Sequence, residues 1–201
     1  CEARAYESLG ILTDHCLLRC EDGRDYEPRF SMLESIRAFG LEKLAQMGEE
    51  TAVRQAHAHY FLELAERLEP TLTGPRQAES FDQLDAEHEN FRAAMQWTRQ
   101  SGDVESGVRL GGALWRFWIS RGHMHEGRPL LESLLEAAES TSSDEIRSKA
   151  LYGLGTLRHY QGDLRPAIEA FERSLEAARR TAQPAASGRS LAGLGWALGL
   201  A

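Results

Sequence analysis

The C-terminal half of the sequence repeats itself at an interval of 40 residues. The segment 151–155, Leu-Tyr-Gly-Leu-Gly, is followed 40 positions later by Leu-Ala-Gly-Leu-Gly at 191–195. Leu-Glu-Ala-Ala likewise occurs at 135–138 and again at 175–178. A period of this size is typical of proteins that stack one supersecondary unit after another, so that each unit covers the apolar face of its neighbour. The repeat therefore predicts a mainly α-helical solenoid of helical hairpins.

The unit that starts at position 151 follows the order of residue types of the tetratricopeptide repeat. Gly155 has no side chain, so the second helix can close against the first. Ala167 keeps the helix crossing tight, Phe171 fills the space between neighbouring repeats, and Gly162 with Asp163 forms the turn, with Asp163 able to cap the next helix. The residues that we expect to pack the repeats are Leu151, Leu154, Gly155, Gly162, Ala167, Phe171, Leu175, Leu191, Leu194 and Gly195.

The repeat departs from the strict pattern in three respects. Arg158 stands where an aromatic residue is expected, and the proline that closes the unit is missing. The period is 40 rather than about 34 residues, with the excess in loops such as 141–143. An earlier unit is weaker still, with Trp115 at the position of Gly155. We therefore describe the repeat as tetratricopeptide-like.

The N-terminal part of the chain has a different pattern. A helix-like run over 9–18 precedes a polar turn at 21–25, and Phe30 and Met32 alternate with polar residues as in a strand. The Asp-Gly pair in the turn favours a β-hairpin. A helix is expected from Leu33 to Gly48. We therefore predict two domains, a winged-helix-like remnant at 1–48 and a tetratricopeptide-like domain at 49–201.

The ends of the sequence and its composition limit the possible functions. The chain starts without Met and stops inside an apolar helical pattern, so we expect a fragment whose repeat domain is truncated at its C-terminus. The net charge of -8 opposes direct nucleic-acid binding. Neither a membrane span nor an apolar signal core is present. Three cysteines clustered near the N-terminus do not form a disulfide framework. These features predict a cytoplasmic protein.

Several residues resemble metal-binding or catalytic groups, but structural roles explain them more simply. His57 and His59, and likewise His123 and His125, are two residues apart, which places each pair on different sides of a helix and disfavours a shared metal ion. The sequence has neither a Gly-x-Ser-x-Gly motif nor a P-loop. We therefore expect no catalytic, cofactor or metal site. Most tryptophans are expected in the core. The possible residues of a partner-binding groove are Trp115, Trp118 and Arg158.

Four segments occur in an order that is familiar. They are RFSMLESIRAF at 29–39, AHAHYFL at 56–62, LDAEHENFRAA at 84–94, and the stretch from ALWRFW to EGR at 113–128. Together they resemble the part of bacterial STAND-class ATPase regulators, the large LuxR-type and SARP-type transcription factors, that runs from the end of the winged helix into the repeats.

The resemblance implies a switch in which an upstream ATPase domain responds to nucleotide and to an inducer or partner. The present chain would then be the non-catalytic sensor scaffold, which binds a protein, a peptide or a small inducer and controls the ATPase. The resemblance implies no cofactor in this chain. An alternative is a free-standing tetratricopeptide adaptor that binds a partner peptide in its concave groove.

Overall fold

The computed structural model describes residues 2–22, 28–138, 142–181 and 183–199, which contain ten α-helices, a short 3₁₀ helix and a two-stranded sheet. The predicted mainly α-helical solenoid, with a small hairpin before it, is confirmed. The chain separates into two compact units, Cys1–Val53 and Arg54–Ala201. Each unit is described below by itself.

The N-terminal unit contains a helix, an antiparallel hairpin and a second helix, namely α1 (Glu2–Asp14), β1 (Arg19–Asp22), β2 (Pro28–Ser31) and α2 (Glu34–Met47). Cys20 pairs with Phe30 in the hairpin. The predicted Asp-Gly turn lies at residues outside the described part of the chain. The first helix ends earlier than the run over 9–18 suggested, because Cys16 adopts a left-handed conformation with φ 57° and redirects the backbone. The helix α2 ends at Gly48, as expected.

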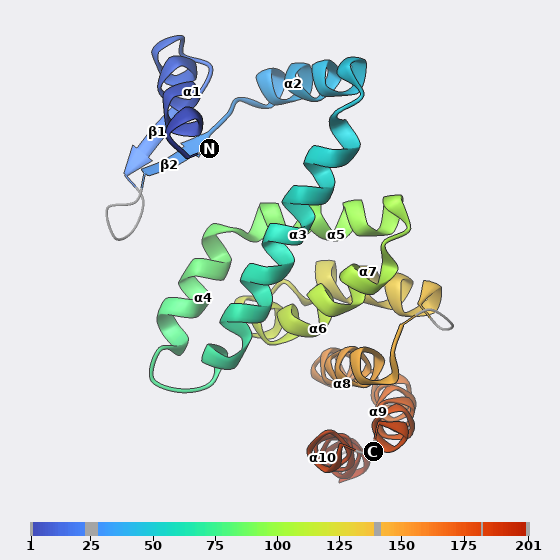
Figure 1. Ribbon diagram of the computed structural model, residues 1–201. Coiled ribbons are helices and arrows are strands. Elements are labelled where there is room, and N and C mark those ends of the chain that lie inside the picture. Colours follow the sequence, from blue (N-terminus) through green and yellow to red (C-terminus); the bar gives the residue numbers. More distant parts are fainter. Residues whose placement is uncertain (1, 23–27, 139–141, 182, 200–201) are drawn as a thin grey trace. The chain divides into compact units, whose positions relative to one another are not determined.

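The second unit is a series of helices joined by short turns (Figure 1). They are α3 (Glu50–Leu68), the 3₁₀ helix η2 (Glu69–Leu72), α4 (Gln77–Ala86), α5 (His88–Ser101), α6 (Val104–Arg121), α7 (Met124–Ala137), α8 (Asp144–Tyr160), α9 (Leu164–Arg180) and α10 (Pro184–Gly199). Two hairpins, α6–α7 and α8–α9, follow one another, and α10 packs against α9 and α8. The turns after α5, α6 and α8 contain Gly102, Gly122 and Gly162 in the left-handed region, where glycine has no steric cost.

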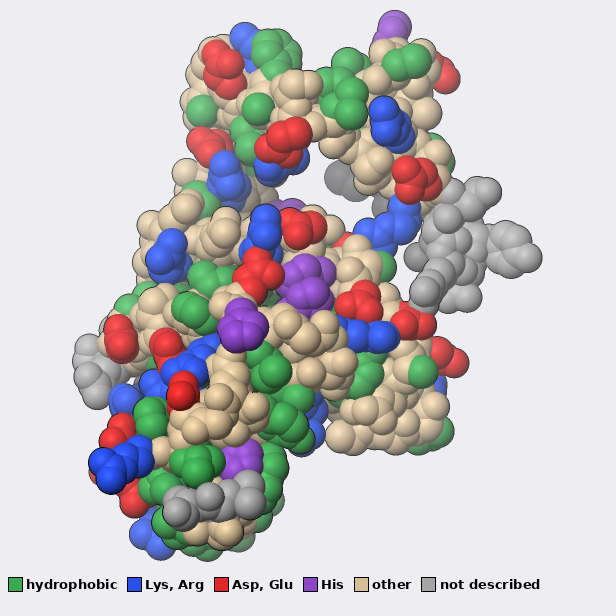
Figure 2. Space-filling view, turned by 180° about the vertical axis from the view of Figure 1, so that it is seen from behind, with side chains coloured by type: hydrophobic (Ala, Val, Ile, Leu, Met, Phe, Trp, Pro, Cys, Tyr) green, Lys and Arg blue, Asp and Glu red, His purple; other side chains and the backbone are tan. Residues whose placement is uncertain are grey.

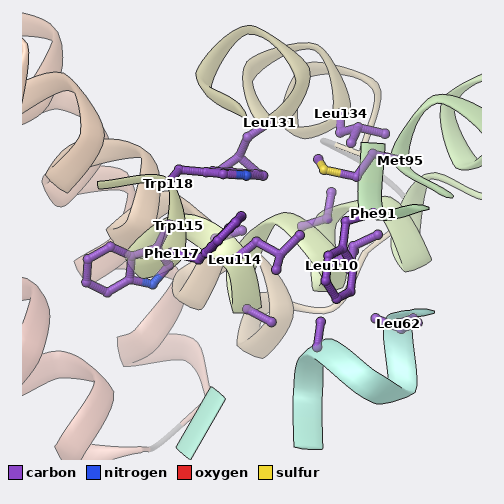
Figure 3. Packing of buried hydrophobic residues seen from close by; sticks show 14 of the residues in the cluster. Leu62, Phe91, Met95, Leu110, Leu114, Trp115, Phe117, Trp118, Leu131 and Leu134 are labelled. Carbon is purple, nitrogen blue, oxygen red and sulfur yellow. The ribbon is translucent and has the colours of Figure 1, made fainter. Parts of the chain in front are cut away.

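The core of this unit surrounds α6 (Figure 3). Leu110, Leu114 and Phe117 of α6 are completely buried. Their neighbours come from three other helices, namely Leu62 of α3, Phe91 and Met95 of α5, and Leu131 and Leu134 of α7. Other helices cover α6 from several sides. This explains why α6 has apolar residues around most of its circumference.

Phe171 of α9 fills the space between α8 and α10. Its ring is completely buried, and a Cβ atom at Gly155 would lie 2.8 Å from it. A Cβ atom at Gly193 of α10 would lie 2.6 Å from the same ring. Each distance is shorter than carbon atoms tolerate, so both positions need glycine for Phe171 to remain where it is.

The other residues expected to pack the repeats divide into two groups. Leu151, Leu154, Ala167 and Leu175 are buried, and Leu194 is partly buried against the Phe171 cluster. Leu191, in contrast, is 51% exposed, and a Cβ atom at Gly195 would meet nothing within 4 Å. Both lie on a side of α10 against which no described helix packs, so in α10 the close contact is made by Gly193 instead.

Arg158 forms polar contacts at the position where an aromatic residue was expected. Its Nε donates to Glu132 Oε1 of α7 over 3.0 Å, and its Nη1 donates to the carbonyl of Pro166 over 3.0 Å. Arg128 Nε also donates to Glu132 Oε1, over 2.9 Å, and its guanidinium pairs with Asp163. Charged hydrogen bonds therefore join the two hairpins on this side. We call Arg128, Glu132, Arg158 and Asp163 the polar joint.

A buried hydroxyl of α9 connects α8 to α10. Ser174 Oγ donates to the Ser148 carbonyl over 2.7 Å and lies 2.8 Å from Ser190 Oγ. We expect Ser174→Ala to lower the free energy of unfolding by about 1–2 kcal/mol, because buried groups lose a hydrogen-bond partner. Chemical denaturation measures this change. Ser187→Ala, on the less buried side of α10, is the control and should shift stability by less than about 0.5 kcal/mol; equal effects of the two variants would contradict the assignment.

Candidate functional site

A groove runs across the first helices of the successive hairpins, α6, α8 and α10. It consists of two adjoining cavities of about 260 and 400 Å³, which share Ser148, Lys149, Ala186 and Arg189. The 3₁₀ helix η2 contributes Glu69 to one of them. The groove is therefore continuous over the two hairpins and α10, as an extended ligand would require.

Basic side chains recur along this groove with the period of the repeat. Arg109 of α6, Lys149 of α8 and Arg189 of α10 all line it, and they are spaced 40 residues apart in the sequence. Equivalent positions of stacked repeats lie side by side, so these three cations form a row across the helices. We call them the basic row.

Two members of the basic row already have acidic partners. Arg109 donates to both carboxylate oxygens of Glu66 over 2.9 and 2.7 Å, and these hydrogen bonds raise the pKa of its guanidinium. Lys149 pairs with Glu69. Both pairs are partly exposed to solvent, where such contacts contribute little to stability and can exchange for a ligand.

Two guanidinium groups of the groove remain available for an anion. Among the described residues, neither Arg116 nor Arg189 forms an ion pair. The Arg116 guanidinium lies 4.3 Å from the centroid of the Trp115 ring, and Trp115 in turn packs edge-on against Tyr152 at 5.7 Å. An arginine held on an aromatic ring keeps its N–H donors free for carboxylate or phosphate. The groove thus combines the aromatic rings of Trp115 and Tyr152 with two arginines that form no ion pair among the described residues.

The three residues expected in a groove are not brought together. Trp115 lines it, with its ring against Gly153 of α8. Trp118 is only 3% exposed and lies against Gly127 of α7 in the core (Figure 3). Arg158 belongs to the polar joint. The two indoles separate because each packs against a glycine of a different neighbouring helix.

The residues that carry the charge of the groove were missed in the sequence. Lys149 and Arg189 are ordinary basic residues on helices, and nothing in their immediate surroundings marks them. The signal was present in the repeat itself, because Arg109, Lys149 and Arg189 keep the same 40-residue spacing as the glycines. A search for charge at equivalent repeat positions would have found them.

Comparison with known proteins supports a repeat and an interaction role. Residues 119–180 match the tetratricopeptide repeat family, whose members generally mediate protein–protein contacts and which is not a catalytic family. This segment runs from the end of α6 through α9 and so includes the α8–α9 hairpin. Within the described residues, every helix is too short or too polar to cross a membrane.

Longer relatives come from mycobacteria. Two proteins named "Putative HTH-type transcriptional regulator", Mb0914c of Mycobacterium bovis and Rv0890c of Mycobacterium tuberculosis, are each 28% identical to the chain over 200 residues. The match covers 96% of this chain and 22% of each relative. The chain therefore spans about a fifth of the length of these relatives and is similar to one segment of each.

Proposed function

We propose that this chain is the protein-interaction scaffold of a bacterial transcriptional regulator, and that its groove binds an acidic segment of a partner protein. The basic row is the observation that carries the proposal, because it places one cation on each of the helices α6, α8 and α10, which line a continuous groove. The match of residues 119–180 to the tetratricopeptide repeat and the similarity to mycobacterial regulators support the same role.

The spacing of the basic row defines the ligand further. Neighbouring packed helices lie about 8–10 Å apart, so the cations repeat at about that interval. An extended peptide advances about 3.3 Å per residue, so carboxylates three residues apart would meet successive cations. The preferred ligand is therefore an extended peptide with Asp or Glu at every third position. Trp115 and Tyr152 would contact its apolar parts.

We further propose that the parent protein is a STAND-class ATPase of the LuxR or SARP type, and that binding in the groove controls the ATPase. The support is the resemblance of four ordered segments and the small hairpin unit before the repeats, which we assign as the end of a winged helix. Nucleotide binding by the full-length parent tests this assignment. A parent that binds neither ATP nor ADP would contradict it and favour the alternative, a free-standing adaptor.

The groove is tested by charge reversal. In the full-length parent, we expect Arg116→Glu combined with Arg189→Glu to weaken binding of a fluorescent peptide with Glu at every third position by at least about tenfold. The reason is that each lost charge-assisted hydrogen bond contributes about 1.5–3 kcal/mol. Fluorescence anisotropy measures the affinity.

The control for this experiment is Arg165→Glu, an exposed arginine on α9 that does not line the groove. It makes a charge change of the same kind and should leave peptide affinity within about twofold of the unmodified protein. A peptide in which every Glu is replaced by Gln should bind weakly to all three proteins. If the double reversal and the control weakened binding equally, the groove would not be the binding site.

A further inference from the structure

A second group of polar side chains lies on the helical unit outside the groove. His88 is the first residue of α5, His123 immediately precedes α7, and Glu126 is in the first turn of α7. One potential ligand atom from each of the three residues lies within 4.8 Å of the others. Figure 2 shows histidine side chains among basic and acidic ones on one face of the molecule. We call His88, His123 and Glu126 the histidine cluster.

The contacts within the histidine cluster are close. His88 Nε2 lies 3.1 Å from Glu126 Oε2. The rings of His88 and His123 stack with their centroids 3.9 Å apart at an interplanar angle of 17°. The second carboxylate oxygen, Glu126 Oε1, accepts a hydrogen bond from Arg92 over 2.9 Å. All three members of the cluster are partly buried, so their positions are set by the packing of α5 against the α6–α7 hairpin.

We propose that the histidine cluster is a zinc-binding site. Two imidazole nitrogens and one carboxylate oxygen are a ligand set that Zn²⁺ takes in proteins, with a water molecule in the fourth position. Hard cations such as Mg²⁺ and Ca²⁺ prefer oxygen ligands, so a set with two imidazole nitrogens favours zinc over them.

The geometry requires one local movement. Ligand nitrogens of a tetrahedral zinc ion lie about 3.3 Å apart, given metal–nitrogen distances of about 2.0 Å. Stacked rings direct their lone pairs in parallel, so one imidazole must turn. His123 is the ring that can do so, because it is 31% exposed and its Nε2 lies 3.9 Å from Asp85, beyond hydrogen-bond distance. His88, which is 17% exposed, can remain in place.

The surroundings of the cluster support a bound cation. Arg92 holds Glu126 through Oε1 and leaves Oε2 for the metal, which is the arrangement in which an outer hydrogen bond orients a ligand.

A further observation concerns charge. The carboxylates of Asp85, Glu89 and Glu126 outnumber the guanidinium groups of Arg92 and Arg121 with which they pair. This local excess of negative charge favours a bound cation.

A zinc ion here would connect helices that are far apart in the sequence. His88 lies 35 positions before His123, so the ion would join the start of α5 to the turn between α6 and α7. The site is separate from the groove, since its residues do not line either cavity there. Zinc would therefore stabilise the arrangement of α5 and the first hairpin without occupying the partner-binding surface.

Titration of the full-length protein with zinc chloride in excess MgCl₂, followed by isothermal calorimetry, tests the proposal. We expect one zinc ion per chain that is lost on chelation, and a raised melting temperature with zinc. His123→Gln and Glu126→Gln should each weaken this binding by at least about tenfold, because three ligands are reduced to two. Cobalt in place of zinc should give the visible absorption of a tetrahedral nitrogen–oxygen site, which His123→Gln abolishes.

The matched control is His125→Gln, which replaces an exposed histidine two positions from His123 and next to Glu126. His59→Gln removes an exposed histidine that pairs with Glu63. Both controls should bind zinc as the unmodified protein does. The proposal is overturned if magnesium displaces the zinc, if His123→Gln and Glu126→Gln bind it unchanged, or if the controls lose it to the same extent.

Discussion

Replacing Gly127 with alanine is expected to lower the free energy of unfolding of the repeat unit by about 1–3 kcal/mol, the range for overpacking a well-filled core. A Cβ atom at this position would lie 2.2 Å from Cδ2 and 2.4 Å from Cε3 of Trp118. These atoms belong to a rigid indole that is 3% exposed, so the ring has little room to move away. Urea unfolding monitored by circular dichroism measures the loss.

Gly195→Ala is the control for this substitution, since it makes the same chemical change inside a helix. The added Cβ atom would have nothing within 4 Å. Alanine restricts the unfolded chain more than glycine does, so this variant should gain about 0.4–1 kcal/mol. The two substitutions should therefore have opposite signs. A Gly127→Ala variant as stable as the Gly195→Ala variant would show that α6 and α7 are not in such close contact.

Phe171→Ala should be still more damaging, with an expected loss of about 3–5 kcal/mol. The ring is completely buried between Gly155 of α8 and Gly193 of α10. Neither glycine has a side chain that could move into the space, so the cavity left by the phenyl group would persist. The larger the residual cavity, the larger the loss of stability.

In a repeat protein this loss should be localised, because each hairpin contacts mainly its neighbours. We expect hydrogen exchange of Phe171→Ala to accelerate in α9 and α10, while amides in α6 keep their protection. Leu191→Ala on the exposed side of α10 is the comparison and should change stability by less than about 0.5 kcal/mol. Uniform acceleration of exchange throughout the helical unit would instead mean that it unfolds as one cooperative body.

Local sequence signals predicted the helices well and the contacts between them only partly. Gly48 and Gly162 follow the ends of helices for reasons of backbone geometry, which depend on neighbouring residues alone. The exposure of Leu191 could not be predicted from neighbouring residues in this way. Its repeat equivalent, Leu151, is buried because another hairpin covers it, and the period of the sequence does not reveal which faces are covered.

The candidate sites show the same contrast between local signals, which the sequence reveals, and contacts between helices, which it does not. Trp115 and Trp118 are three residues apart on one helix, yet one lines the groove and the other is in the core. The sequence places His123 beside His125, whereas in the structure the His123 ring stacks on His88, which lies 35 positions away. A pairing of this kind depends on how α5 packs against the α6–α7 hairpin, and spacing along a single helix contains no information about it.

The polar joint has a mechanical consequence for the groove. The ion pair of Arg128 with Asp163 and the hydrogen bond from Arg158 to Glu132 cross from one hairpin to the next, and such charge-assisted contacts weaken when their geometry is distorted. Any rotation of one hairpin against the next must stretch them. The joint therefore acts as a stop that limits how far the spacing of the basic row can change. Since these side chains are partly exposed to solvent, salt should screen the two contacts and weaken this limit as ionic strength rises.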